Sequence, residues 1–215
     1  MVKGILFDFD GVIADTEPLH YRTFNETLKE LGIKIMEDEW KKFEGTGSDH
    51  IMKTLFNDNK IEHNTEEWIK KRRDRFWDHI KNNEIPLKKG LLEFLNLLDN
   101  KGIKKAVCSG SRTDSIEYIL EKNNIRKYFQ AVCGIDQVKN RKPDPEVFLL
   151  GAKKIGVDIS NCIIIEDSIV GVQAARKTSA KCVFFSEKKE KESELKGCSA
   201  IIRDYSEFPL NLLEE

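Results

Sequence analysis

The sequence lacks a long apolar run. No window approaches the ~20 apolar residues that a membrane-spanning helix needs. The apolar stretch at the N-terminus carries a single lysine, Lys3, and is interrupted by Asp8, which makes it too short for a secretory signal peptide. We therefore expect a soluble protein that remains inside the cell and has no contact with a membrane.

Paired cysteines are also missing. The five cysteines are odd in number, lie far apart and never occur as Cys-x-x-Cys, so the sequence gives no indication of a zinc site. We expect reduced thiols in the core of a cytoplasmic protein. The cysteines are Cys108, Cys133, Cys162, Cys182 and Cys198.

An excess of charge of one sign is absent. The 36 Lys and Arg residues balance 37 Asp and Glu residues, for a net charge of -1. This balance provides no general attraction to nucleic acid or to an acidic membrane, so any basic site must be local. A chain of 215 residues can bury roughly 70% of its unfolded surface, enough for one domain with a smaller insert, and we expect it to be a monomer.

Helical patterns fill the chain between residues 15 and 85. Asp15 and Thr16 are suited to cap a helix that has Pro18 in its first turn and an apolar stripe ending at Gly32. No strand-like run interrupts this region. Further helices are expected over residues 37–44, 48–57 and 64–82, and all three tryptophans lie among them.

From Pro86 onward, helices and short apolar strands alternate. Alternation of this kind predicts a parallel sheet with helices on both faces, in which ligands bind beyond the carboxyl ends of the strands. We therefore expect an α/β fold with a Rossmann-like parallel core, residues 1–14 and 86–215, and an inserted α-helical domain, residues 15–85. The expected strands are residues 2–6, 104–108, 131–133, 162–165, 181–185 and 200–202.

Polar residues follow several of these strands. Asp8 and Asp10 come after the first strand, before Gly11, and two like charges this close repel unless a cation or a proton is shared between them. Magnesium is the natural partner of such hard oxygen ligands. Ser109-Gly110, Lys142 and Glu166-Asp167 lie at or near later strand ends, and together they form a constellation suited to a phosphate and its metal.

In order and combination, these motifs resemble the haloacid dehalogenase superfamily of phosphatases and phosphomutases, and within it the beta-phosphoglucomutase-like group with a helical cap. The resemblance covers essentially the whole chain. It is carried by Asp8-Phe9-Asp10-Gly11-Val12, Asp15-Thr16-Glu17, Ser109, Lys142-Pro143-Asp144-Pro145 and Glu166-Asp167-Ser168.

The resemblance implies a role for each catalytic residue. Asp8 would be the nucleophile that forms an aspartyl phosphate, and Asp10 the general acid and base. Ser109, Gly110 and Lys142 would hold the transferring phosphoryl group. All four histidines fall between residues 20 and 79, so the strand-end site has no imidazole of its own.

The resemblance also implies the cofactor and the activity. Mg²⁺ would be bound by Asp8, by the backbone carbonyl of Asp10 and by Asp167, with Glu166 at the metal end of the site. The expected activity is hydrolysis of a small phosphomonoester, such as a sugar phosphate, with a cap that sets specificity. A receiver-type phospho-acceptor domain combines similar groups, but such domains have no cap and carry the acceptor on an internal strand.

A phosphomutase is the other enzymatic alternative, and the loop that begins at Gly45 bears on it. A mutase must hold a second phosphate, and beta-phosphoglucomutases place an arginine just after the corresponding glycine, where this sequence offers Ser48. The basic run Lys70-Lys71-Arg72-Arg73 with Arg75 contains possible substitutes. We expect that run to be a solvated helix face, so hydrolysis is favoured over the mutase reaction.

Overall fold

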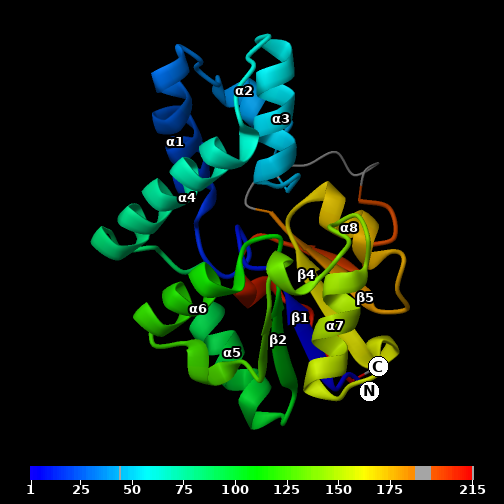
Figure 1. Ribbon diagram of the computed structural model, residues 1–215. Helices are drawn as coiled ribbons and strands as arrows, with labels where there is room; N and C mark the ends of the chain where they lie inside the picture. The colour runs from blue at the N-terminus through cyan, green and yellow to red at the C-terminus, as the bar shows by residue number, and fades with distance from the viewer. Residues whose placement is uncertain (44, 187–194, 215) are drawn as a thin grey trace. The chain divides into compact units, whose positions relative to one another are not determined.

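The computed structural model describes residues 1–43, 45–186 and 195–214, and the chain divides into two compact units (Figure 1). The first, here called the core unit, comprises Met1–Asp15 and Leu87–Glu215, and the second, the insert, comprises Thr16–Pro86. Each boundary lies one residue beyond the position expected from the sequence.

A six-stranded parallel sheet organises the core unit, in the order β3-β2-β1-β4-β5-β6. The first strand in the sequence lies inside the sheet, with Phe7 opposite Val107 on one side and Ile165 on the other. All four residues of β1 are buried, because helices cover both faces. The strands are β1 Gly4–Phe7, β2 Lys104–Cys108, β3 Ala131–Cys133, β4 Cys162–Glu166, β5 Lys181–Phe185 and β6 Ala200–Ile202.

Two pairs of helices cover the sheet. Figure 1 shows α5 and α6 on one face and α7 and α8 on the other. Leu6, Ile164 and Phe148 belong to the apolar cluster beneath α7 and α8. The helices are α5 Leu91–Asn100, α6 Thr113–Lys122, α7 Glu146–Ile155 and α8 Ile169–Ala175, and the 3-10 turns are η2 Arg126–Tyr128, η3 Ile135–Gln137, η4 Ile159–Asn161, η5 Tyr205–Glu207 and η6 Leu210–Leu213.

The insert is helical and has an apolar core of its own. Phe24, Met52 and Trp68 are among the buried residues of this core. Trp40 also belongs to it, whereas Trp77 is half-buried. The elements are α1 Glu17–Leu28, η1 Lys29–Leu31, α2 Glu37–Trp40, α3 Ser48–Asp58 and α4 Thr65–Asn82.

One expectation for α4 is wrong: its basic run is not uniformly a solvated face. Arg72 is buried, with 6% of its surface exposed. Its Nε donates to Thr23 Oγ1 at 3.1 Å, another guanidinium nitrogen contacts His20 Nδ1, and the guanidinium lies over the rings of Phe24 and Phe76. The reason is helical periodicity, because position 72 shares the inward face of α4 with residues 68 and 76.

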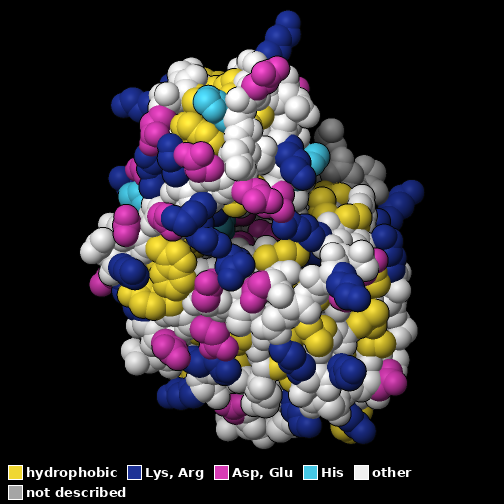
Figure 2. All heavy atoms as spheres, in the orientation of Figure 1, with side chains coloured by type: hydrophobic (Ala, Val, Ile, Leu, Met, Phe, Trp, Pro, Cys, Tyr) yellow, Lys and Arg dark blue, Asp and Glu magenta, His cyan; other side chains and the backbone are white. Residues whose placement is uncertain are grey.

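The surface agrees with the balanced composition. On the face shown in Figure 2, Lys and Arg side chains are interspersed with Asp and Glu side chains. Among the described residues, none of the helices combines the length and apolar character that crossing a membrane requires.

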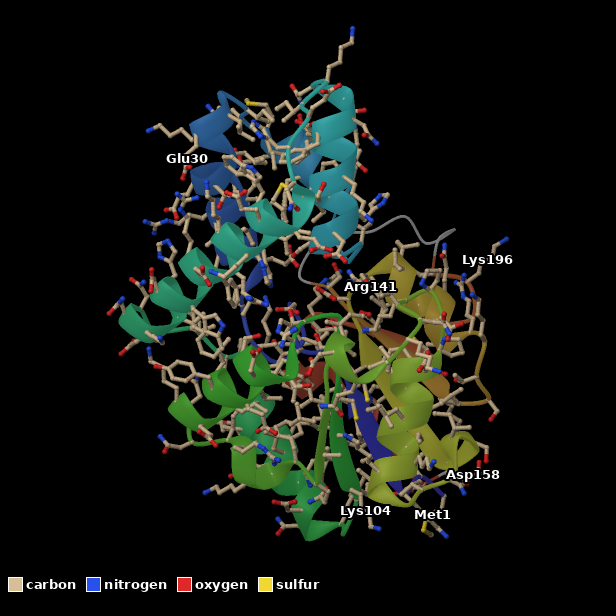
Figure 3. The ribbon with its side chains drawn as sticks, viewed as in Figure 1. Met1, Glu30, Lys104, Arg141, Asp158 and Lys196 are labelled. Carbon is tan, nitrogen blue, oxygen red and sulfur yellow. The ribbon has the colours of Figure 1, made fainter. Side chains whose placement is uncertain are left out.

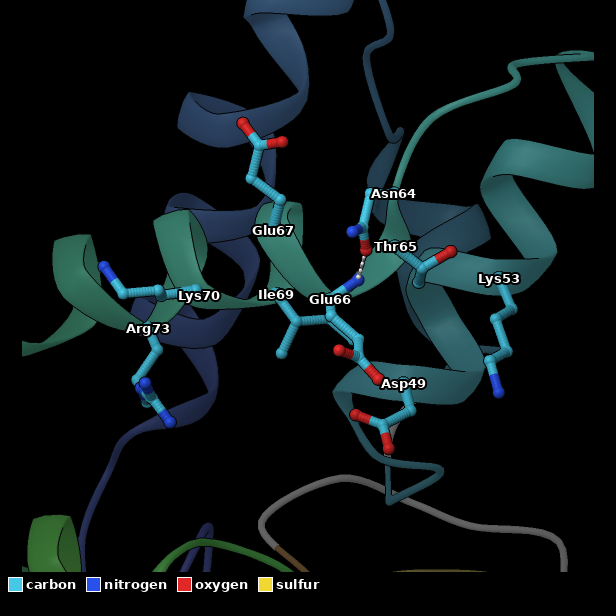
Figure 4. A pocket seen from close by; sticks show the side chains of 9 residues that line it. All are labelled: Asp49, Lys53, Asn64, Thr65, Glu66, Glu67, Ile69, Lys70 and Arg73. Atoms are coloured by element: carbon cyan, nitrogen blue, oxygen red, sulfur yellow. Dashed lines mark hydrogen bonds between the residues drawn. The ribbon is translucent and has the colours of Figure 1, made fainter.

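A groove on the insert lies between α3 and the beginning of α4 (Figure 4). Asp49 and Lys53 line it from α3, and Glu66 and Lys70 line it from α4, so it carries charges of both signs. The Asn64 side chain caps α4 by accepting a hydrogen bond from the backbone N–H of residue 66. None of the strand-end residues lines this groove.

Candidate active site

The polar residues expected at the strand ends all belong to the core unit, at the carboxyl edge of its sheet. In Figure 3, Lys104 marks the amino end of β2, and Arg141, in the loop that carries Lys142, lies toward the opposite end of the sheet. Asp8 follows β1, and its backbone N–H donates to Ile165 O on β4 at 2.9 Å. The pairing of β1 with β4 therefore places Asp8 beside the end of the strand that carries Glu166.

Lys142 joins two of the carboxylates. Its ammonium donates to Asp8 Oδ1 and to Glu166 Oε1, each at 2.8 Å, and only 7% of its side chain is exposed. Asp8 and Glu166 are 6% and 0% exposed. The Lys142 side chain is therefore a buried cation shared by two acids.

Burial and charge together shift the pKa values of this pair. Burial raises the pKa of Asp8; Glu166 and Asp10 add to the rise, Lys142 opposes it, and the pKa reaches about 8. Burial tends to lower the pKa of Lys142, but the Asp8 and Glu166 carboxylates outweigh it, so its pKa is raised. Lys142 thus stays charged, and Asp8 favours a proton chiefly because its carboxyl group is buried, with the neighbouring acids adding to the effect.

Glu166 is held from several directions. Its Oε2 accepts the backbone N–H groups of Asp167 at 2.6 Å and Ser168 at 3.0 Å, and its Oε1 accepts Ser168 Oγ at 3.2 Å as well as Lys142. Helix α8 passes so close that a Cβ at Gly171 would lie 1.5 Å from Glu166 Oε1. A side chain held this firmly can fix the direction of Lys142.

Asp10 lies in a turn rather than on the strand, because β1 ends at Phe7. Its Oδ2 accepts the hydroxyl groups of Ser111 at 2.6 Å and Ser109 at 3.2 Å. Ser109 is buried, and its Oγ also accepts the backbone N–H of Ser111 at 3.0 Å. Sequence reasoning did not assign Ser111, and the only signal was its position two residues after Ser109.

Gly110, expected to help hold a phosphate, is exposed between these two serines. A Cβ added there would meet nothing within 4 Å. The structure thus shows no close packing that would explain glycine at this position.

The acidic groups are suited to a hard divalent cation. One carboxylate oxygen from each of Asp8, Glu166 and Asp167 lies within 4.8 Å of the others. Gly11 has φ +73°, and a Cβ there would lie 1.9 Å from Asp167 Oδ2, so the turn containing Asp10 packs directly against Asp167. Oxygen donors grouped in this way fit Mg²⁺.

Comparison with known proteins identifies the family of this chain. Residues 5–185 match the family described as haloacid dehalogenase-like hydrolase. The phosphorylated carbohydrates phosphatase of Thermotoga maritima is 28% identical, with 85% of this chain and 84% of that protein covered. The fructose-1-phosphate phosphatase YqaB of Escherichia coli is 29% identical, with 84% and 94% covered.

The fold has close counterparts among crystal structures. That of beta-phosphoglucomutase from Clostridium difficile superposes with a TM-score of 0.87 at 23% sequence identity, over 100% of this chain and 96% of that chain. At this level of identity the match establishes the fold, and it leaves the choice between hydrolase and mutase open.

Proposed function

This chain belongs to the haloacid dehalogenase-like hydrolase family, and from that premise we propose that it is a magnesium-dependent phosphatase that acts through an aspartyl phosphate on Asp8. The enzyme class, phosphoric monoester hydrolase, follows from the family and from its phosphatase relatives. The observation that carries the finer proposal is the buried Lys142, which bonds Asp8 and Glu166 at 2.8 Å beside Asp167.

Asp8 is the nucleophile in this proposal. One carboxylate oxygen attacks phosphorus, the bond to the leaving oxygen breaks, and the phosphoryl group is transferred to Asp8. Lys142 and the Ser109 hydroxyl bind phosphoryl oxygens, and Glu166 holds Lys142 in position. When bound by Asp8, Asp167 and the Asp10 carbonyl, Mg²⁺ would supply positive charge that favours phosphoryl transfer.

Asp10 moves the protons. It donates one to the departing alkoxide and accepts one from the water that attacks the aspartyl phosphate, which restores its starting state. In the structure its carboxyl group is oriented by Ser109 and Ser111. Breaking the hydrogen bonds from Ser109 and Ser111 would allow the Asp10 carboxyl group to contact the substrate.

We propose a phosphorylated sugar or a related small metabolite as the substrate. The support is that two relatives of similar length are named for phosphorylated carbohydrates and for fructose 1-phosphate. The insert serves as the cap that selects among such substrates. We place the enzyme in the reducing cytoplasm, because all five cysteines are free thiols.

A phosphomutase is the second candidate, and one observation favours it. The buried Arg72 lies beside the loop in which beta-phosphoglucomutases carry their arginine, with Nη1 3.5 Å from Ser48 Oγ. A guanidinium is therefore present next to the residue that occupies that place. Hydrolysis remains the primary proposal because Arg72 is also engaged with Thr23 and His20.

The decisive experiment is a screen of phosphorylated sugars with the purified protein, with and without Mg²⁺, alongside Asp8→Asn. We expect phosphate release that requires Mg²⁺, and a loss of at least about 10³-fold in Asp8→Asn, because the amide is neither nucleophilic nor anionic. Circular dichroism should show that the variant is folded. Undiminished turnover in folded Asp8→Asn would refute the assignment of the nucleophile.

A further inference from the structure

A buried hydrogen bond connects the catalytic turn to a distant part of the core unit. The phenol of Tyr205, in η5, donates to Val12 O at 2.9 Å, and Tyr205 is only 3% exposed. Val12 stands two residues after Asp10 and one after Gly11.

The turn between Phe9 and Ala14 is compact, so a bond at one point fixes its other residues. Ile13 N–H and Ala14 N–H both donate to Phe9 O, at 2.9 and 3.1 Å, and Gly11 N–H donates to Ala14 O at 2.9 Å. Asp10 is enclosed by these bonds. A displacement of the Val12 carbonyl therefore moves the backbone that carries the Asp10 carboxyl group.

The turn is held from two sides. Next to Asp10, Gly11 packs against Asp167, where even a methyl group would collide with Oδ2. Further along, Tyr205 holds the carbonyl of Val12. The two contacts together determine the position from which the Asp10 side chain projects out of the turn.

Tyr205 is itself firmly placed. Its ring packs against Phe7, Phe94 and Phe185, with centroids 6.3, 5.1 and 5.1 Å away. Its backbone N–H donates to Lys89 O at 3.2 Å, and the neighbouring Asp204 forms an ion pair with Lys89 at 2.8 Å. Because Phe7 is the last residue of β1, the ring supports the strand and its hydroxyl supports the turn that follows.

We propose that Tyr205 is a positioning residue for Asp10, which holds the turn so that the Asp10 carboxyl group can deliver its proton to the leaving group. The proposal rests on the proposed function. Removal of the Tyr205 hydroxyl should therefore impair proton transfer by Asp10. This defect should be larger than any loss of activity that results from a smaller folded fraction.

The test uses Tyr205→Phe and two substrates that differ in their need for a proton. An alkyl phosphate leaves as an alkoxide and requires the acid, whereas 4-nitrophenyl phosphate leaves as a stable phenolate and does not. We expect kcat/KM for the alkyl phosphate to fall by about tenfold or more, and that for the aryl phosphate to change by less than about twofold. The ratio of the two values is independent of the folded fraction, so the test remains valid for a destabilised variant.

Tyr21→Phe is the matched control. Tyr21 Oη donates to Ile35 O at 3.0 Å, so the substitution removes the same kind of bond within the insert rather than within the core unit. We expect an unchanged ratio. In an Asp10→Ala background, Tyr205→Phe should cause no further loss on the alkyl phosphate, because the residue it positions is gone.

Equal losses on both substrates in Tyr205→Phe, no loss on either, or the same change of ratio in Tyr21→Phe would each overturn the proposal. A further loss in the Asp10→Ala background would overturn it too. Wild-type protein that hydrolyses neither substrate with Mg²⁺ would instead contradict the proposed function, which keeps the two failures distinct.

Discussion

At the scale of single residues, the charge state of Asp8 makes the core unit sensitive to pH. Its pKa is raised from an ordinary 3.8 to about 8. At a pH between these two values, the Asp8 carboxyl group holds a proton in the folded protein and releases it in the unfolded chain. Without metal, the contribution of Asp8 to the free energy of unfolding should therefore be greatest below about pH 4 and fall as the pH rises toward 8, by on the order of a few kcal/mol.

Urea unfolding of EDTA-treated protein, followed by far-ultraviolet circular dichroism at several pH values, measures this effect. Asp8→Asn lacks the titrating group and should lose less stability across the same pH window. A wild-type stability that rises with pH relative to Asp8→Asn would show that the sign is wrong.

The sequence indicated most of the chemical groups of the site, for a physical reason. Parallel strands bring their carboxyl ends to one edge, so Asp8 and Glu166, at or next to strand ends, are placed by the strand pattern alone. The contacts of Ser111 with Asp10 and of Tyr205 with Val12 depend on turn geometry and on a sequence separation of 193 residues in the second case. No local pattern contains that information.

At the scale of elements, one buried cation, Arg72, holds the polar helix α4 in place within the insert. Replacing Arg72 by Met retains much of the apolar stem but removes the donors to Thr23 and Ser48 and the contact with His20. We expect the insert to lose about 2 kcal/mol of unfolding free energy. Tryptophan fluorescence during urea unfolding measures it selectively, because all three tryptophans lie in the insert.

Lys70→Met is the control on the same helix. Lys70 is exposed and forms an ion pair with Asp74, one turn away on the same helix, at 3.1 Å, so its replacement should cost less than about 0.5 kcal/mol. Similar effects of the two substitutions would show that the buried position of Arg72 does not contribute to stability.

The apolar patterns predicted the bounds of four strands correctly, but they did not predict where one helix ends. The expected strands over residues 104–108, 131–133, 181–185 and 200–202 match β2, β3, β5 and β6. The expected helix over 37–44 ends at Trp40 as α2; residues 41–43 form a turn, and residue 44 lies outside the described residues. The pattern there marks burial of Trp40 and Phe43, and burial does not require the helix to continue.

At the scale of the whole molecule, the products distinguish the two candidate activities. Beta-glucose 1-phosphate supplied with Mg²⁺ and a trace of the 1,6-bisphosphate should yield glucose 6-phosphate slowly or not at all, with free phosphate as the main product from preferred substrates. The reason is that Ser48 replaces the arginine expected of a mutase and Arg72 is bound within the insert. Coupled assays for both products provide the measurement, and glucose 6-phosphate appearing much faster than phosphate would establish the mutase.

The position of β1 has a consequence for how the protein is made. Gly4 pairs with Lys104 and with Cys162, so β1 gains its neighbours only after long stretches of later sequence have been translated. The insert, in contrast, is one continuous segment with an apolar cluster of its own. Its helices can therefore assemble on the nascent chain while the centre of the sheet is still unpaired.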